Sequence, residues 1–135
     1  TLYHGHSYGG NALAAAVALR HLALLEEWDV LTNVAARSAQ LGRLLDHHVA
    51  PLPAVKEVRL LGLMGGVELC PPADGLRWGR RVCAAAVRGG VLLRPLGDVV
   101  VLMPMLTSTE DEIERIVTVL AEAINEVTAE NAAAG

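Results

Sequence analysis

Short β-rich segments occur in two pairs, and helical patterns fill the rest of the chain; this alternation constrains the fold more than any other feature. The first pair lies in residues 58–69, where glycines interrupt the strand pattern and allow either a β-hairpin or a bent pair. In the second pair, residues 91–94 and 99–103 flank a turn at residues 95–98, so we expect antiparallel neighbours. From residue 29 onward the pattern predicts a small α+β domain, a sheet with helices packed on one side.

Four helices are predicted. The first begins after the N-cap Asn11 and ends near Trp28, and its many alanines indicate close packing against a neighbour. The second covers residues 30–48, the third residues 74–88 with Gly89 and Gly90 as its C-terminal cap, and the fourth follows capping boxes within residues 107–112. The tail from residue 130 has no apolar anchor and is expected to fray. The second helix should bury Val30, Val34, Leu41, Leu44, Leu45 and Val49, and expose Arg37, Gln40 and Arg43.

Composition narrows the class of protein. A chain of 135 residues that is 53% hydrophobic and 19% charged can form one globular core. Its net charge of -4 leaves no basic face for a nucleic acid, and no apolar run reaches the roughly 18 residues of a membrane span. Without a signal-peptide pattern, a cytoplasmic location is expected. Cys70 and Cys83 form no CxxC pair, and His4 and His6 lack a third ligand of convincing spacing, so neither a disulfide framework nor a metal site is expected.

A polar, glycine-bearing turn, residues 3–11, leads directly into the first helix. Backbone N–H groups and the helix dipole at such a helix start favour a phosphate or another anion. No strand pattern precedes this helix, so we expect that further sequence lies upstream.

Two sequence blocks carry a family resemblance. Residues 4–11, HGHSYGGN, followed by an alanine-rich helix, are similar to the HGxTYxGN block of class III pyridoxal-phosphate-dependent aminotransferases. Residues 62–69, GLMGGVEL, resemble the later GLMxGxEL block of the same family. Residues 90–104, which contain RPLG and LMP, resemble the members of this class that act in biotin biosynthesis. The order of the blocks agrees with the C-terminal part of the family's chain.

The resemblance implies an α/β protein, the C-terminal part of a fold-type I pyridoxal-phosphate-dependent transferase. It assigns residues 1–28 to the end of the large cofactor-binding domain with an interdomain helix. Residues 29–135 then form the small C-terminal α+β domain.

The resemblance also implies roles for four residues. Ser7 matches the position that binds the phosphate of pyridoxal 5'-phosphate across the interface of a homodimer, and His6 contributes to this contact through its main chain. Gly5 matches a position whose backbone approaches the substrate. Arg94 matches the arginine that binds the carboxylate of the keto-acid substrate. Without the motifs, Ser7 is better interpreted as a turn residue near a helix start. Arg94 has the alternative of an ordinary surface arginine or a structural ion-pair partner.

The reaction implied is a transfer of an amino group from a small-molecule amine donor to a keto-acid acceptor. In biotin biosynthesis the donor is S-adenosylmethionine and the acceptor is 8-amino-7-oxononanoate, which becomes 7,8-diaminononanoate. Other class III omega-amino acid aminotransferases remain an alternative. A non-catalytic anion-binding module or partner subunit derived from this domain is a further alternative.

Two departures from the family pattern limit the resemblance. The Schiff-base lysine of the family precedes the first block, whereas the only lysine of this chain is Lys56, which we expect to be a solvated residue at a strand edge. The chain is therefore predicted to contain no catalytic residue and to be inactive by itself. Val101 stands where some relatives carry an aromatic residue that lines the substrate site.

Overall fold

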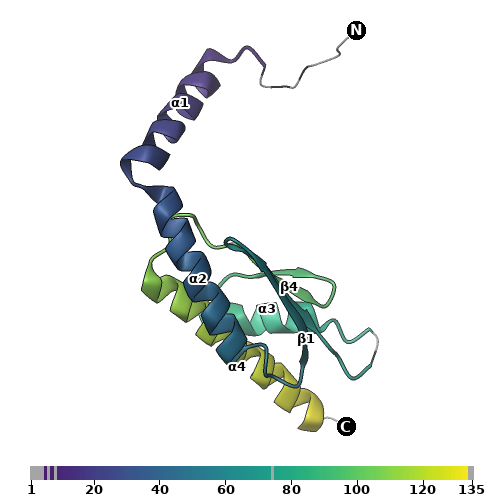
Figure 1. The fold of residues 1–135 in the computed structure, drawn as a ribbon. Helices are drawn as coiled ribbons and strands as arrows, with labels where there is room; N and C mark the ends of the chain where they lie inside the picture. The colour runs from purple at the N-terminus through teal and green to yellow at the C-terminus, as the bar shows by residue number, and fades with distance from the viewer. Residues whose placement is uncertain (1–4, 6, 8, 74, 134–135) are drawn as a thin grey trace.

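The computed structural model describes residues 5, 7, 9–73 and 75–133. One antiparallel sheet is covered on one side by helices, and the first helix extends away from this unit (Figure 1). The elements in chain order are α1 (Ala12–Glu27), α2 (Val30–His48), β1 (Val55–Leu61), β2 (Met64–Leu69), α3 (Trp78–Arg88), β3 (Arg94–Leu96), β4 (Val99–Leu102) and α4 (Glu110–Ala133).

The four strands lie in the order β1-β2-β4-β3, and every neighbouring pair is antiparallel. The first β-rich segment is thus a hairpin, and the bent-pair alternative is wrong. Gly62 has a φ of 60° in its turn, a conformation in which glycine carries no steric penalty. β3 and β4 pair as the sequence predicts.

The core lies between the inner face of the sheet and the helices. Its fully buried side chains come from every helix except α1, and α4 contributes a complete apolar face at steps of three and four residues. The largest of them are Leu41, Leu45, Val49, Val67, Val82, Val100, Leu102, Ile113, Val117, Leu120, Ile124 and Val127.

Several element boundaries differ from the sequence prediction. α3 begins at Trp78 because the backbone of Arg77 is left-handed, with a φ of 51°; residue 74 lies outside the described residues. The segment before β3 is not a strand, because the N–H of Val91 donates to the carbonyl of Ala86 and completes a Schellman cap around Gly90.

The C-terminal helix also runs further than expected. α4 continues to Ala133, and Glu130 accepts a hydrogen bond from Arg81 of α3 at 3.0 Å. The predicted fraying from residue 130 is therefore wrong for the described residues.

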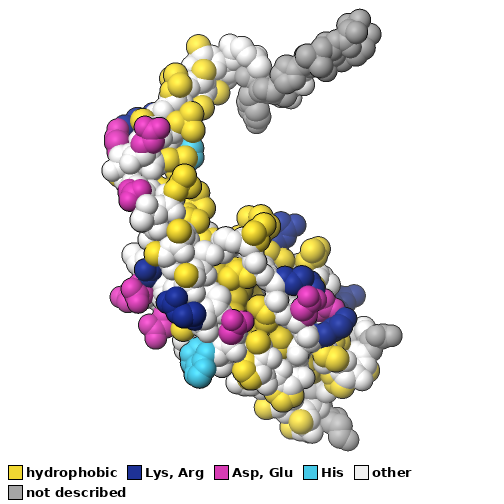
Figure 2. Space-filling model, in the orientation of Figure 1, with side chains coloured by type: hydrophobic (Ala, Val, Ile, Leu, Met, Phe, Trp, Pro, Cys, Tyr) yellow, Lys and Arg dark blue, Asp and Glu magenta, His cyan; other side chains and the backbone are white. Residues whose placement is uncertain are grey.

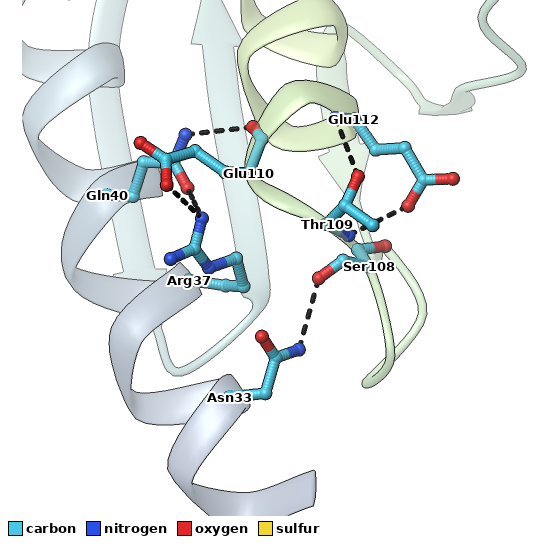
Figure 3. A network of polar contacts seen from close by, with 7 residues as sticks. All are labelled: Asn33, Arg37, Gln40, Ser108, Thr109, Glu110 and Glu112. Atoms are coloured by element: carbon cyan, nitrogen blue, oxygen red, sulfur yellow. Dashed lines mark hydrogen bonds and ion pairs between the residues drawn. The ribbon is translucent and has the colours of Figure 1, made fainter.

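A polar network joins α2 to the start of α4 (Figure 3). Gln40 donates from Nε2 to the carbonyl of Glu110 at 2.9 Å, and only 7% of this residue is exposed. Asn33 donates from Nδ2 to the carbonyl of Ser108 at 3.1 Å. The expectation that Gln40 lies on the solvent face of α2 is thus wrong, because α4 covers it.

α1 forms as predicted but without the close packing that its alanines suggest. The side chain of Asn11 accepts a hydrogen bond from the N–H of Ala14 at 3.1 Å, which caps the helix. No residue of α1 is buried against the described part of the chain. The helix contacts α2, and Leu24 and Leu25 near its C-terminus line a cavity together with Met105 and Leu106.

Candidate functional site

The outer face of the sheet, opposite the helices, carries the predicted substrate residue Arg94. Arg94 pairs with Val101, and Val101 pairs with Gly66. Side chains of directly paired residues lie on the same face of a sheet. The next pair along these strands, Val100 and Val67, has buried side chains and therefore lies on the core face. Because successive residues alternate between the two faces, the row of Arg94, Val101 and Gly66 faces away from the core.

A cavity of about 400 Å³ lies where β3 begins and β4 ends, and Arg94 lines it. The walls near Arg94 are otherwise apolar, with Leu92, Met103 and Pro104 among them. Leu92 and Met103 are 87% and 67% exposed, which is unusual for such large apolar side chains. A guanidinium at the edge of an apolar cavity can bind a carboxylate while the cavity accepts an aliphatic chain.

Arg94 makes no hydrogen bond or ion pair with any other described residue. Arg59, at the other edge of the sheet, instead pairs with both Glu57 and Glu68. The donors of Arg94 are therefore available to an added anion, whereas those of Arg59 are engaged.

Lys56 lies on the edge strand β1, as predicted, and its ammonium forms an ion pair with Glu68 at 2.6 Å. The hydrogen bond that Lys56 donates to Glu68 raises the pKa of Lys56 above its ordinary value, and the hydrogen bonds that Lys56 and Arg59 donate lower the pKa of Glu68. An amine that acts as a nucleophile requires a lowered pKa. The surroundings of Lys56 therefore disfavour a role as the amine that holds the cofactor.

Residues 9–11 precede α1, at the end of that helix that points away from the sheet (Figure 1). Gly5 and Ser7 are exposed, and His6 lies outside the described residues. Among the described residues, the cavity that Arg94 lines does not include Ser7, so the expected phosphate-binding and carboxylate-binding residues do not share this cavity. The first turn of α1 contains no acidic residue that would repel an anion.

Among the described residues, no three His, Cys, Asp or Glu side chains gather in a way that could hold a metal ion. Likewise, none of the described helices combines the length and the apolar character needed to cross a membrane.

Two residues on the Arg94 side of the sheet were not predicted to belong to the site. Gly66 was assigned only to a motif, and Met103 only to a β-rich segment. From the sequence, the alternation of side chains along a strand could have placed Met103 on the same face as Val101. That Gly66 lies beside Val101 could not have been predicted, because it depends on the register between β2 and β4.

Comparison with known proteins places the chain in a family. The family model described as aminotransferase class-III matches residues 1–124. The adenosylmethionine-8-amino-7-oxononanoate aminotransferase of Nitratidesulfovibrio vulgaris is 43% identical over 100% of this chain and 26% of that relative. A diaminobutyrate–2-oxoglutarate transaminase of Halomonas elongata is 34% identical over 93% of this chain and 29% of that relative.

A solved structure agrees with these similarities. The adenosylmethionine-8-amino-7-oxononanoate aminotransferase of Methanocaldococcus jannaschii superimposes with a TM-score of 0.84 and 35% identity, over 93% of this chain and 30% of that one. The chain therefore spans between a quarter and a third of the length of these relatives.

Proposed function

Because the chain belongs to the class III aminotransferase family, we propose that it forms the C-terminal part of a pyridoxal-phosphate-dependent aminotransferase. The observation that carries this proposal beyond family membership is Arg94, a guanidinium that lines an apolar cavity and has no partner among the described residues. A keto acid with an aliphatic chain fits both features.

Arg94 binds and orients the acceptor. Its planar group donates two parallel hydrogen bonds to the substrate carboxylate, which fixes the direction in which the rest of the molecule extends. Orientation of this kind accelerates a reaction, because the substrate loses its translational and rotational freedom on binding and not in the reaction step.

Ser7 and His6 hold the cofactor phosphate of the second subunit in a homodimer, and Gly5 lies against its substrate. The groups present suit a phosphate: a hydroxyl at Ser7 and the positive end of the α1 dipole, with no acidic residue in the first turn of that helix. Residues 1–28 then belong to the large domain and residues 29–135 to the small one.

Pyridoxal 5'-phosphate supplies the electron sink for amino transfer when it is bound. Lys56 takes no part, because its charge is stabilised by Glu68. The lysine that holds the cofactor therefore comes from outside this chain, and these 135 residues contribute binding and orientation only.

We propose S-adenosylmethionine as the amine donor and 8-amino-7-oxononanoate as the acceptor, in a cytoplasmic enzyme of biotin biosynthesis. The names of the most similar relatives support this choice. The second candidate is another omega-amino acid aminotransferase, which the 34% identity to a diaminobutyrate–2-oxoglutarate transaminase favours. A non-catalytic partner subunit remains the alternative if no lysine-bearing segment is joined to this chain.

The test is Arg94→Ala in the full-length polypeptide that carries this chain. We expect KM for 8-amino-7-oxononanoate to rise about tenfold to a hundredfold, because charge-assisted hydrogen bonds are lost. The half-reaction with the amine donor should keep its rate. Arg43→Ala is the matched control, since Arg43 is an exposed arginine of α2. Equal loss in both half-reactions would contradict the role of Arg94.

A further inference from the structure

Gly66 occupies the middle of β2, where a glycine is unfavourable. Glycine weakens a strand interior because it gains no side-chain packing and loses more backbone entropy on folding. Neither a positive φ nor a steric clash within the described part of the chain requires glycine at position 66. The φ of Gly66 is not positive, and an added Cβ would meet only Val99 Cγ1, at 3.4 Å, which is ordinary contact. Alanine would therefore fit here within the described part of the chain.

The preceding glycine differs. An added Cβ at Gly65 would approach Leu60 Cδ1 to 3.3 Å and Leu102 to 3.4 Å, and both neighbours lie toward the core. Packing inside the domain thus accounts for Gly65 but not for Gly66. A strand glycine without an internal reason is typical of a place where a ligand or another backbone approaches closely.

Gly66 shares its row on the outer face with Arg94. The row crosses β3, β4 and β2 through Val101, so Gly66 lies two strand spacings, about 10 Å, from Arg94. A nine-carbon acid whose carboxylate is held by Arg94 has a chain of comparable length. The half-buried side chain of Val101 lies between Arg94 and Gly66 and lines the apolar cavity together with Arg94, whereas Gly66 lies beyond the cavity on the same face of the sheet.

The charges around Gly66 also suit an aliphatic chain. Glu68 lies on the same face two residues further along β2, and its carboxylate is bound by Lys56 and Arg59 at 2.6 and 2.8 Å. Figure 2 shows such pairs of opposite charge next to each other over this part of the molecule. The nearest acidic group is therefore ion-paired on the β1 side. Arg59, which pairs directly with Gly66 across the strands, is itself engaged by Glu57 and Glu68, so its charge is compensated on that side of Gly66.

From these observations we infer that Gly66 determines how long an acceptor can lie on the sheet when Arg94 holds its carboxylate. The absence of a side chain at position 66 leaves room for the distal carbons of a medium-chain keto acid. A larger residue would exclude these carbons and leave the carboxylate contact intact. This inference rests on the proposed role of Arg94 and deepens it by naming the class of acceptor.

The test uses the 135-residue chain and two simple carboxylates, acetate and nonanoate, titrated separately and followed by NMR. In the unsubstituted chain, both should shift the side-chain N–H of Arg94, but only nonanoate should also shift the amides of Gly66 and Val101. Gly66→Val should weaken nonanoate binding about tenfold and change acetate binding less than about twofold, because only the longer chain reaches position 66. Gly66→Ala should give a smaller effect in the same direction without loss of stability.

Gly65→Ala is the matched control, because it adds the same methyl group to the neighbouring glycine on the opposite face. It should lower the stability of the domain and leave the ratio of the two affinities unchanged. If Gly66→Val leaves nonanoate binding unchanged while both acids still shift Arg94, this inference is overturned and the role of Arg94 stands. If neither acid shifts Arg94, its carboxylate role is wrong and the inference fails with it. An equal loss of nonanoate preference in Gly65→Ala would also overturn the assignment to Gly66.

Discussion

At the scale of single residues, Gln40 shows how a polar side chain becomes part of the core. Its Nε2 donates to the carbonyl of Glu110, and its Oε1 accepts from Arg37 (Figure 3). Arg37 is itself only 16% exposed in its side chain and lies 3.3 Å from the carboxylate of Glu110. Both polar ends of the buried amide are therefore satisfied, and this is the condition under which burying an amide is tolerated.

Removal of the Gln40 amide should be costly. We expect Gln40→Ala to lower the free energy of unfolding by about 1–3 kcal/mol, because it removes a buried hydrogen bond and leaves a small void. Urea denaturation of the 135-residue chain measures this change. Asn125→Ala removes an amide from the exposed face of α4 and should change the stability by less than about 0.5 kcal/mol. Equal effects of the two substitutions would mean that the network contributes nothing.

At the scale of elements, the caps connect sequence and structure most directly. Thr109 and Glu112 form a reciprocal capping box at the start of α4: the N–H of Thr109 donates to Glu112 Oε2 at 2.9 Å, and the N–H of Glu112 donates to Thr109 Oγ1 at 3.3 Å. Each bond satisfies a backbone donor that the first helical turn leaves without a partner.

Thr109→Ala should therefore destabilise the domain by about 1 kcal/mol. The matched control is Thr118→Ala, the same substitution at an exposed site within α4. There alanine should be neutral or slightly stabilising, because its helix propensity is higher. The two urea midpoints should move in different directions, and a common shift would argue against the capping role.

The difference between local interactions and contacts that are distant in sequence explains which features of the fold the sequence could predict. Local rules locate the start of α1, the end of β1 and the start of α4. The residues responsible, Asn11, Gly62 and Thr109, act through hydrogen bonds or backbone angles within a few residues. Gln40 could not be placed, because its partner is 70 residues away in sequence. Gly66 and Arg94 are related only by the register of three strands, which no local pattern specifies.

At the scale of the whole molecule, α1 stands apart from the domain that follows it. Hydrophobic side chains lie along its length (Figure 2), and Leu13, Val17 and Trp28 are each more than half exposed. Continuous apolar surface of this kind favours association with another surface in water. Because α1 contributes no buried residue, this surface should govern association without affecting the stability of the domain.

The combined substitution Leu13→Glu and Val17→Glu separates these two properties. We expect the unsubstituted 135-residue chain to self-associate reversibly as its concentration rises, and the double variant to sediment as a monomer, because exposed apolar area is replaced by charge. The free energy of unfolding should change by less than about 0.5 kcal/mol. Arg20→Glu is the control: it changes the net charge by the same amount but removes no apolar side chain, so association should persist. Monomeric behaviour of the unsubstituted chain, or equal dispersal by Arg20→Glu, would show that the apolar side chains of α1 do not drive association.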